Sequence, residues 1–146
     1  MSYTIKTQKG EFMNIALIAH DTKKELMSQF STAYCGILSK HNLHATGGTA
    51  KLVGEAVGLK AQRYLGGVQG GVQQITSSIS CGEIDILFFF RETQKREIGK
   101  HDDMDILRVC DVHNIPTATN IATAEALILA LQRGDLDWIK GDKIEF

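Results

Sequence analysis

Short runs of apolar residues alternate along the chain with longer segments in which apolar residues recur every three or four positions. The runs at Asn14–Ala19 and Ile84–Phe90 are almost wholly apolar, which is typical of parallel strands buried on both faces. Segment 23–39 carries its apolar residues at helical spacing, which predicts an amphipathic helix. The whole pattern predicts strands at 14–19, 43–46, 61–65, 84–90 and 117–120, and helices at 23–39, 49–57, 73–80, 102–112 and 124–131.

The regular alternation of these patterns defines the expected fold class. It predicts an α/β protein with a doubly wound, mainly parallel five-stranded sheet and helices on both faces. Segment 138–144 adds an expected edge strand or small hairpin around Gly141 and Asp142. Residues 1–12 are polar and irregular, so we expect a flexible N-terminal extension followed by a single domain at 13–146.

Charge and cysteine content narrow the function classes. With 16 Lys and Arg residues against 17 Asp and Glu residues, the chain lacks the basic surplus expected of a protein that binds nucleic acid or an anionic membrane. Its three cysteines are widely spaced and odd in number, which favours free thiols in a reducing compartment over disulfides or a thiolate metal site. Residues 1–12 lack a signal-peptide pattern, and no apolar run approaches the roughly 20 residues of a spanning helix. We expect a cytoplasmic protein with a local binding site and no metal.

Polar and glycine residues gather where the predicted strands end. The carboxyl ends of parallel strands meet at one edge of a sheet, so these residues should form a single rim. They are His20–Asp21, Thr46–Thr49, Gly66–Gln74, Arg91–Glu92 and Asn120, with His101 and Asp102 in a loop nearby. The first turn of a helix exposes backbone N–H groups that suit an anion. Two glycine-rich turns before helices therefore predict a phosphate pocket.

Each of these features also has a purely structural explanation. The glycines can simply allow tight strand-to-helix turns, and Thr49 and Asp102 are good helix N-caps. His20 can be an ordinary surface histidine, and Lys23 and Lys24 ordinary exposed lysines. The coincidence of two glycine turns with a histidine and an aspartate after the first strand favours the binding site, where one of the two lysines could reach a phosphate.

Five segments carry a resemblance to a known family. They are Ile15–Asp21, Leu43–Gly47, Gly70–Gln74, Asp85–Phe89 and Asn114–Ala124. In order and spacing they resemble methylglyoxal synthase over about residues 13–130. The resemblance implies a doubly wound sheet, a homohexamer, no metal or organic cofactor, and a carbon–oxygen lyase. That enzyme converts dihydroxyacetone phosphate to methylglyoxal and inorganic phosphate. Related domains also serve as effector-binding modules in larger enzymes.

The resemblance assigns roles to residues that match the family pattern. It implies that His20 and Asp21 line the active site, and that a set of residues on the rim holds the phosphate. That set is Lys24, Thr46, Thr49 and Gly67, with Gly48 and Gly66 at the positions where the family has threonine and serine. Backbone N–H groups at these two glycines can still bind phosphate.

Other matched positions depart from the family pattern, and the departures involve the chemistry. The family has a glycine-glycine-aspartate motif whose aspartate is the catalytic base, and this chain has Val72 there. An aspartate-proline pair after the fourth strand corresponds to Glu92 and Thr93. In the following loop, His101 is the nearest match to the family's histidine, and Asp102 aligns with its final aspartate.

Two functions from different classes follow. In one, the chain is a methylglyoxal synthase in which Glu92, Asp21 or Asp102 acts as the base and His20 or His101 handles the proton on the substrate oxygen. In the other, it is a catalytically degenerate member that binds a small phosphorylated metabolite as a sensor or regulatory module. His20, Asp21 and the carboxylates of the rim favour the enzyme, whereas Val72, Gly66 and Gly48 favour the binding protein. A structural oligomer without a ligand is a third reading, which the glycine turns disfavour.

Overall fold

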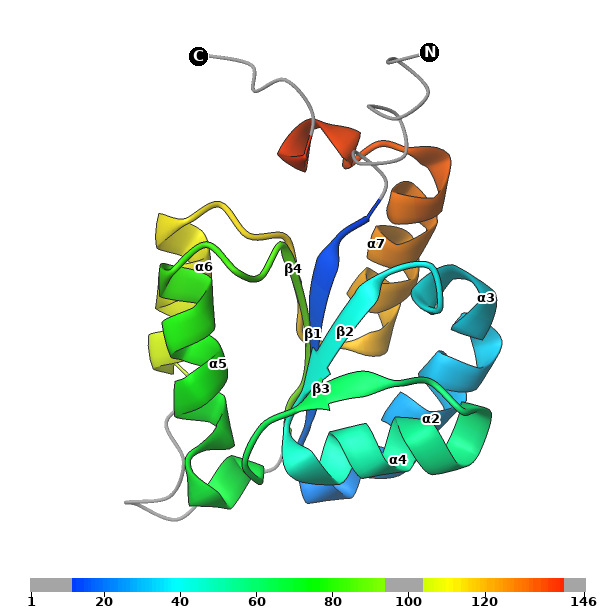
Figure 1. The fold of residues 1–146 in the computed structure, drawn as a ribbon, viewed down its shortest axis with the longest axis vertical. Helices are drawn as coiled ribbons and strands as arrows, with labels where there is room; N and C mark the ends of the chain where they lie inside the picture. The colour runs from blue at the N-terminus through cyan, green and yellow to red at the C-terminus, as the bar shows by residue number, and fades with distance from the viewer. Residues whose placement is uncertain (1–11, 94–103, 141–146) are drawn as a thin grey trace.

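The computed structural model describes residues 12–93 and 104–140 and contains one five-stranded parallel sheet (Figure 1). The strand order is β3-β2-β1-β4-β5, and all four pairings between neighbours are parallel. The strands are β1 (Asn14–Ala19), β2 (Asn42–Ala45), β3 (Ala61–Arg63), β4 (Ile86–Phe90) and β5 (Thr117–Ala118). The predicted fold class is therefore confirmed.

Helices cover both faces of this sheet. Figure 1 shows α5 and α6 on one side, with α2, α4 and α7 on the other. The α-helices are α2 (Lys24–Ala33), α3 (Cys35–Leu38), α4 (Gly47–Val57), α5 (Gly71–Ser80), α6 (Met104–Val112) and α7 (Ile121–Arg133). Three short 3₁₀ helices are η1 (Asp21–Lys23), η2 (Gly67–Gln69) and η3 (Asp137–Ile139). No helix in the two described ranges is long and apolar enough to cross a membrane.

Strand β4 shows why the apolar runs predicted strands buried on both faces. Phe88 and Phe90 pack with Phe30 of α2 in one hydrophobic cluster. Phe89 belongs to the other cluster, together with Ile75 of α5. Since alternate side chains of a strand point to opposite faces, every residue of β4 is buried against a helix layer. The apolar run is continuous because the side chains on both faces of the strand are buried.

The predicted helices differ from the structure in two informative places, the middle of the first helix and the start of the second. The helix expected at 23–39 is interrupted at Tyr34, whose φ of −118° and ψ of 24° lie outside the helical region. Thr49 was expected as the N-cap of the next helix, and this is wrong. Helix α4 begins two residues earlier, at Gly47, with Thr46 at the N-cap position, because both glycines of the turn adopt helical conformation.

The predicted C-terminal strand is also wrong where the structure describes it. Trp138 and Ile139 belong to η3, a 3₁₀ turn whose Lys140 N–H donates to the carbonyl of Asp137. The remainder of segment 138–144, from residue 141, lies outside the described residues, as do His101, Asp102 and the predicted extension apart from Phe12.

The sheet changes its direction of winding between β1 and β4. From β1 the chain builds outward to β2 and β3, and it then crosses to the other side of β1 to form β4 and β5. In sheets of this kind, ligands bind outside the carboxyl ends of the strands at such a switch point. A ligand site is therefore expected between the segments that follow β1 and β4.

Candidate active site

The chain segments after β1 and β4 are joined by hydrogen bonds. The His20 N–H donates to the Phe90 carbonyl at 3.1 Å, extending the strand pairing by one step. The Glu92 N–H donates to Nδ1 of the His20 ring at 2.7 Å. The structure thus brings together two predicted catalytic residues from strands that are adjacent in the sheet.

The bond to Nδ1 defines the state of the His20 ring. Because a backbone N–H can only donate, Nδ1 accepts, and the neutral ring carries its proton on Nε2. The ring also packs edge-on against Phe89, with 5.2 Å between ring centroids. A neutral imidazole held in this tautomer can donate from Nε2 to a carbonyl oxygen that gains negative charge.

The carboxylate of Glu92 is held at both oxygens. Oε2 accepts a hydrogen bond from the Thr22 hydroxyl at 2.5 Å, and Oε1 accepts from the Thr93 N–H at 2.9 Å. The carboxylate is therefore oriented by one donor from η1 and one from its own loop.

Lys24, the first residue of α2, contacts the end of β1 and the following turn. The Lys24 ammonium group donates to the Ala19 carbonyl and lies 3.6 Å from Oδ1 of Asp21. Burial lowers the pKa of Lys24, and the negative charge of Asp21 partly opposes that effect. Asp21 itself points into solvent, with its side chain 99% exposed. Lys24 also approaches the N-terminus of α4, because a Cβ atom added to Gly48 would lie 3.1 Å from its Cε.

The two threonines of the first glycine turn are buried and bonded to each other. The Thr46 hydroxyl donates to Oγ1 of Thr49 at 3.3 Å, and the same oxygen accepts from the Ala19 N–H at 3.2 Å. Thr49 is fully buried, so its hydroxyl ties the end of β1 to the first turn of α4. Among the described residues, the N–H groups of Gly48 and Thr49 have no backbone partner, as expected for the first turn of a helix.

The second glycine turn packs directly on the first. The Gly47 N–H donates to the Leu65 carbonyl at 3.1 Å, and a Cβ atom on Gly47 would lie 3.3 Å from the Gly66 nitrogen. Gly71 allows the tightest approach, since a Cβ atom there would lie 1.9 Å from the Leu65 carbonyl oxygen. Gly66 therefore lies against the turn that carries Gly47 and Gly48.

Val72 is an apolar packing residue in this structure. It lies in the first turn of α5, is half-buried and packs against the hydrophobic cluster of that face. Its side chain has no acid–base function, so the carboxylates near the rim are the candidates for a base.

Nine of the predicted site residues thus lie on the rim at the carboxyl edge of the sheet: His20, Asp21, Lys24, Thr46, Gly48, Thr49, Gly66, Gly67 and Glu92. The other two, His101 and Asp102, are outside the described residues. Sequence reasoning missed Thr22, and it predicted no contact for Thr93 or for Gln74, whose side-chain oxygen accepts from the Leu65 N–H at 2.7 Å. Thr22 carried a usable signal, because it lies two residues after the histidine that follows β1.

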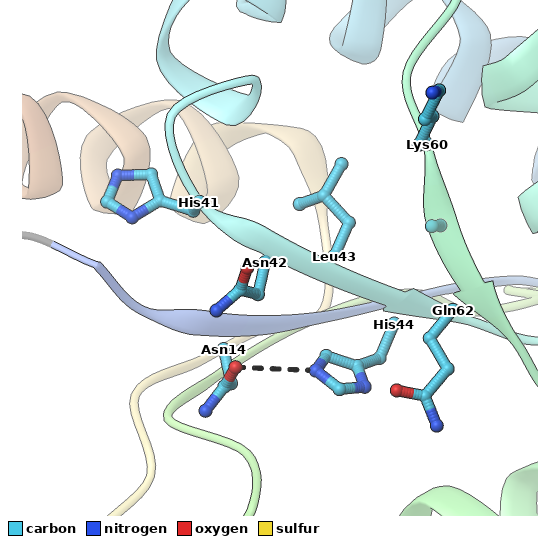
Figure 2. Close-up of a pocket in the computed structure, with 8 residues that line it drawn as sticks. Asn14, His41, Asn42, Leu43, His44, Lys60 and Gln62 are labelled. Carbon is cyan, nitrogen blue, oxygen red and sulfur yellow. Dashed lines mark hydrogen bonds between the residues drawn. The ribbon is translucent and has the colours of Figure 1, made fainter.

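A separate polar cavity of about 520 Å³ lies at the opposite edge of the sheet (Figure 2). None of the predicted site residues lines it. Figure 2 shows the Asn14 and His44 side chains directed toward each other, and the bond between Nε2 and Oδ1 measures 3.5 Å. On its other side the His44 ring is bonded to the Tyr64 hydroxyl at 3.3 Å. Burial lowers the pKa of His44.

In residues 12–93 and 104–140, no group of three His, Cys, Asp or Glu side chains could hold a metal ion.

Fold and site together define an open parallel α/β protein that has a histidine–glutamate pair and two glycine turns at its switch point. Comparisons with known proteins make this class more specific. Residues 29–119 match the family model described as the MGS-like domain.

Two methylglyoxal synthases illustrate the similarity in sequence. The protein of that name from Caldicellulosiruptor saccharolyticus is 59% identical over 126 residues, which is 86% of this chain and 89% of the relative. The one from Oceanobacillus iheyensis is 52% identical, over 86% of this chain and 90% of its own length. The crystal structure of methylglyoxal synthase from Elizabethkingia anophelis NUHP1 superposes with a TM-score of 0.78 at 35% identity, covering 90% of this chain and 82% of that one. This chain belongs to the methylglyoxal synthase family.

Proposed function

We propose that this protein is a methylglyoxal synthase that converts dihydroxyacetone phosphate to methylglyoxal and inorganic phosphate. The observation that carries the proposal is the hydrogen bond from the Glu92 backbone N–H to Nδ1 of His20 at the switch point, which makes an imidazole donor and a carboxylate-bearing residue neighbours on the rim. Family membership supports the same substrate class, because the relatives at 52–59% identity are named for this reaction.

The chemistry needs three groups in one place. A base takes a proton from the hydroxymethyl carbon of the substrate, and the electron pair moves toward the neighbouring carbonyl oxygen to form an enediolate. In our proposal, Nε2–H of His20 stabilises that oxygen. The enediolate then expels inorganic phosphate as the bond between the methylene carbon and the phosphate ester oxygen breaks. The resulting enol becomes methylglyoxal by giving up its hydroxyl proton and taking up a proton on the methylene carbon. Lys24 and the N–H groups at the start of α4 offer a site for the phosphate.

We assign the role of base to Glu92. Val72 cannot accept a proton. Glu92 carries a carboxylate, and its backbone N–H donates a hydrogen bond to the ring of His20. Asp21 is a weaker candidate, since its side chain is almost fully exposed and pairs with Lys24. Loss of a general base typically lowers a rate by about 10²–10⁴-fold. Removal of the Glu92 carboxylate should therefore lower kcat by a similar factor.

The decisive experiment measures methylglyoxal formation from dihydroxyacetone phosphate by the purified protein and by a Val72→Asp variant. We expect turnover by the parent protein, and its loss in Glu92→Gln with substrate binding retained. Circular dichroism of each variant checks that the fold is intact. A parent protein without turnover would overturn the proposed activity.

The half-buried Val72 favours one alternative, a protein that binds a small phosphorylated metabolite as a sensor. Saturable binding of inorganic phosphate by calorimetry, with no turnover, would support this function. An active Val72→Asp variant of an inactive parent would show that only the base has been lost.

We further propose that the protein acts in the cytoplasm as a homohexamer built from one domain at 13–146, with residues 1–12 as an extension. Family membership supports the assembly, and large apolar side chains on the surface, such as Leu65, Val112 and Trp138, offer contact area. Light scattering coupled to size-exclusion chromatography would measure the mass of the particle. Deletion of residues 1–12 should leave the number of subunits per particle and the activity unchanged.

A further inference from the structure

The carboxylate of Glu92 has more freedom than a shorter aspartate, because a glutamate side chain has one more rotatable bond. A single hydrogen bond leaves such a carboxylate free to rotate about the bond to its donor. Here each oxygen has its own donor, the Thr22 hydroxyl on Oε2 and the Thr93 N–H on Oε1. Two donors on separate oxygens fix both the direction and the plane of the group.

The two donors come from different parts of the rim. Thr93 follows Glu92 directly, so its N–H holds the carboxylate close to its own loop. Thr22 lies in η1 after β1, 70 residues away in sequence. Threonine is stiff about its first side-chain torsion because it is branched at Cβ, so its hydroxyl is a well-placed donor. The Glu92 carboxylate is thus tied to the same segment that carries His20.

We propose that Thr22 is a positioning residue that holds the Glu92 carboxylate beside His20 for proton abstraction. This inference rests on the proposed function, since it assigns Thr22 a role only if Glu92 is the base. Thr22 does not touch the reacting atoms. It fixes the distance between the base and the imidazole donor, and a base held in place lowers the barrier without binding the substrate more tightly.

The experiment compares kcat and KM for dihydroxyacetone phosphate in the parent, Thr22→Val and Thr22→Ser. Valine keeps the shape of threonine and lacks the hydroxyl. We expect Thr22→Val to lower kcat by about 10- to 100-fold, the range for losing a hydrogen bond to a charged group, with KM unchanged. Thr22→Ser restores a hydroxyl and should recover most of the lost rate. Exchange of the substrate's hydroxymethyl proton in deuterated water should fall in parallel with kcat, since that step needs the base.

Thr32→Val is the matched control. Thr32 is an exposed threonine of α2 whose hydroxyl donates to the Ser28 carbonyl within its own helix, and the variant should keep the kinetics of the parent. An active parent with an unchanged kcat in Thr22→Val would overturn the inference and leave the proposed function standing. So would a Thr22→Ser variant as slow as Thr22→Val, or a loss that appears in KM alone. A parent that makes no methylglyoxal would overturn the proposed function and this inference together.

Discussion

Replacing Gly71 by alanine should destabilise the rim more than alanine would at Gly47, Gly48, Gly66 or Gly67. The added Cβ atom would lie 1.9 Å from the carbonyl oxygen of Leu65 and 3.0 Å from that of Gly66. Both atoms belong to the backbone and cannot rotate away as a side chain would. The Leu65 oxygen must therefore move by about 1.5 Å to reach an ordinary van der Waals distance.

The size of the effect follows from two losses. Overpacking of this kind is destabilising by about 1–3 kcal/mol. The hydrogen bond from the Gly71 N–H to the Gly66 carbonyl, 2.9 Å long, is broken or stretched when the turn moves, which adds about 0.5–1.5 kcal/mol. We expect the free energy of unfolding to fall by about 2–4 kcal/mol, which lowers the melting temperature by roughly 5–15 °C in a chain of this size.

Thermal unfolding followed by circular dichroism, at one fixed protein concentration, measures this effect. Gly36→Ala is the matched control, because Gly36 lies in helix α3 with no atom within 4 Å of its added Cβ. That variant should keep or raise the melting temperature, since alanine favours a helix by about 1 kcal/mol over glycine. If Gly71→Ala melts at the temperature of the wild type, the close approach of the two glycine turns is refuted.

Three further changes test other parts of the molecule. Lys24→Met should weaken the binding of inorganic phosphate by about 10- to 100-fold in calorimetry without lowering stability, because burial of the ammonium group opposes folding, whereas Lys40→Met should bind as the wild type does. Thr49→Val leaves the Ala19 N–H without its acceptor, so urea unfolding should show a loss of about 1–3 kcal/mol that Thr49→Ser recovers. Burial holds the pKa of His44 below its ordinary value of 6.5. Below about pH 6.5, His44 therefore binds a proton more readily in the unfolded chain than in the folded chain, and the free energy of unfolding falls as the pH falls. The difference in unfolding free energy between the wild type and His44→Gln should therefore shrink between about pH 7.5 and pH 5.5, and an equal difference at both values would contradict this reasoning.

The central strands β1 and β4 were readable from the sequence because burial on both faces leaves a strong signal. The apolar run 84–90 predicted β4, and the structure gives Ile86–Phe90 with all five residues buried. The last segment was read wrongly as a strand, because Trp138 and Ile139 form a short apolar pair before the turn residues Gly141 and Asp142, and nothing local distinguishes that pattern from a single 3₁₀ turn.

The rim was predictable as a region and less so in its details. The topology of a parallel sheet places every strand end at one edge, which located His20 and Glu92 together without any knowledge of their contact. The position of Thr22 after β1 indicates that it lies near the rim, but not which side chain its hydroxyl contacts, because such a contact has no periodicity. Thr49 was read as a helix cap because the two glycines before it look like a turn, although they adopt helical conformation.

The contact between Glu92 and His20 joins two points of the chain that are 72 residues apart. Contacts between residues so far apart in sequence form only after the intervening chain has lost conformational entropy. Here that chain includes β2, α4, β3 and α5. The pair therefore comes into being with the central β1–β4 pairing, as part of the same cooperative unit, and no early folding intermediate without β4 contains it. A ligand that needs both residues thus recognises the completed fold alone, and its binding free energy is added to the stability of the whole domain.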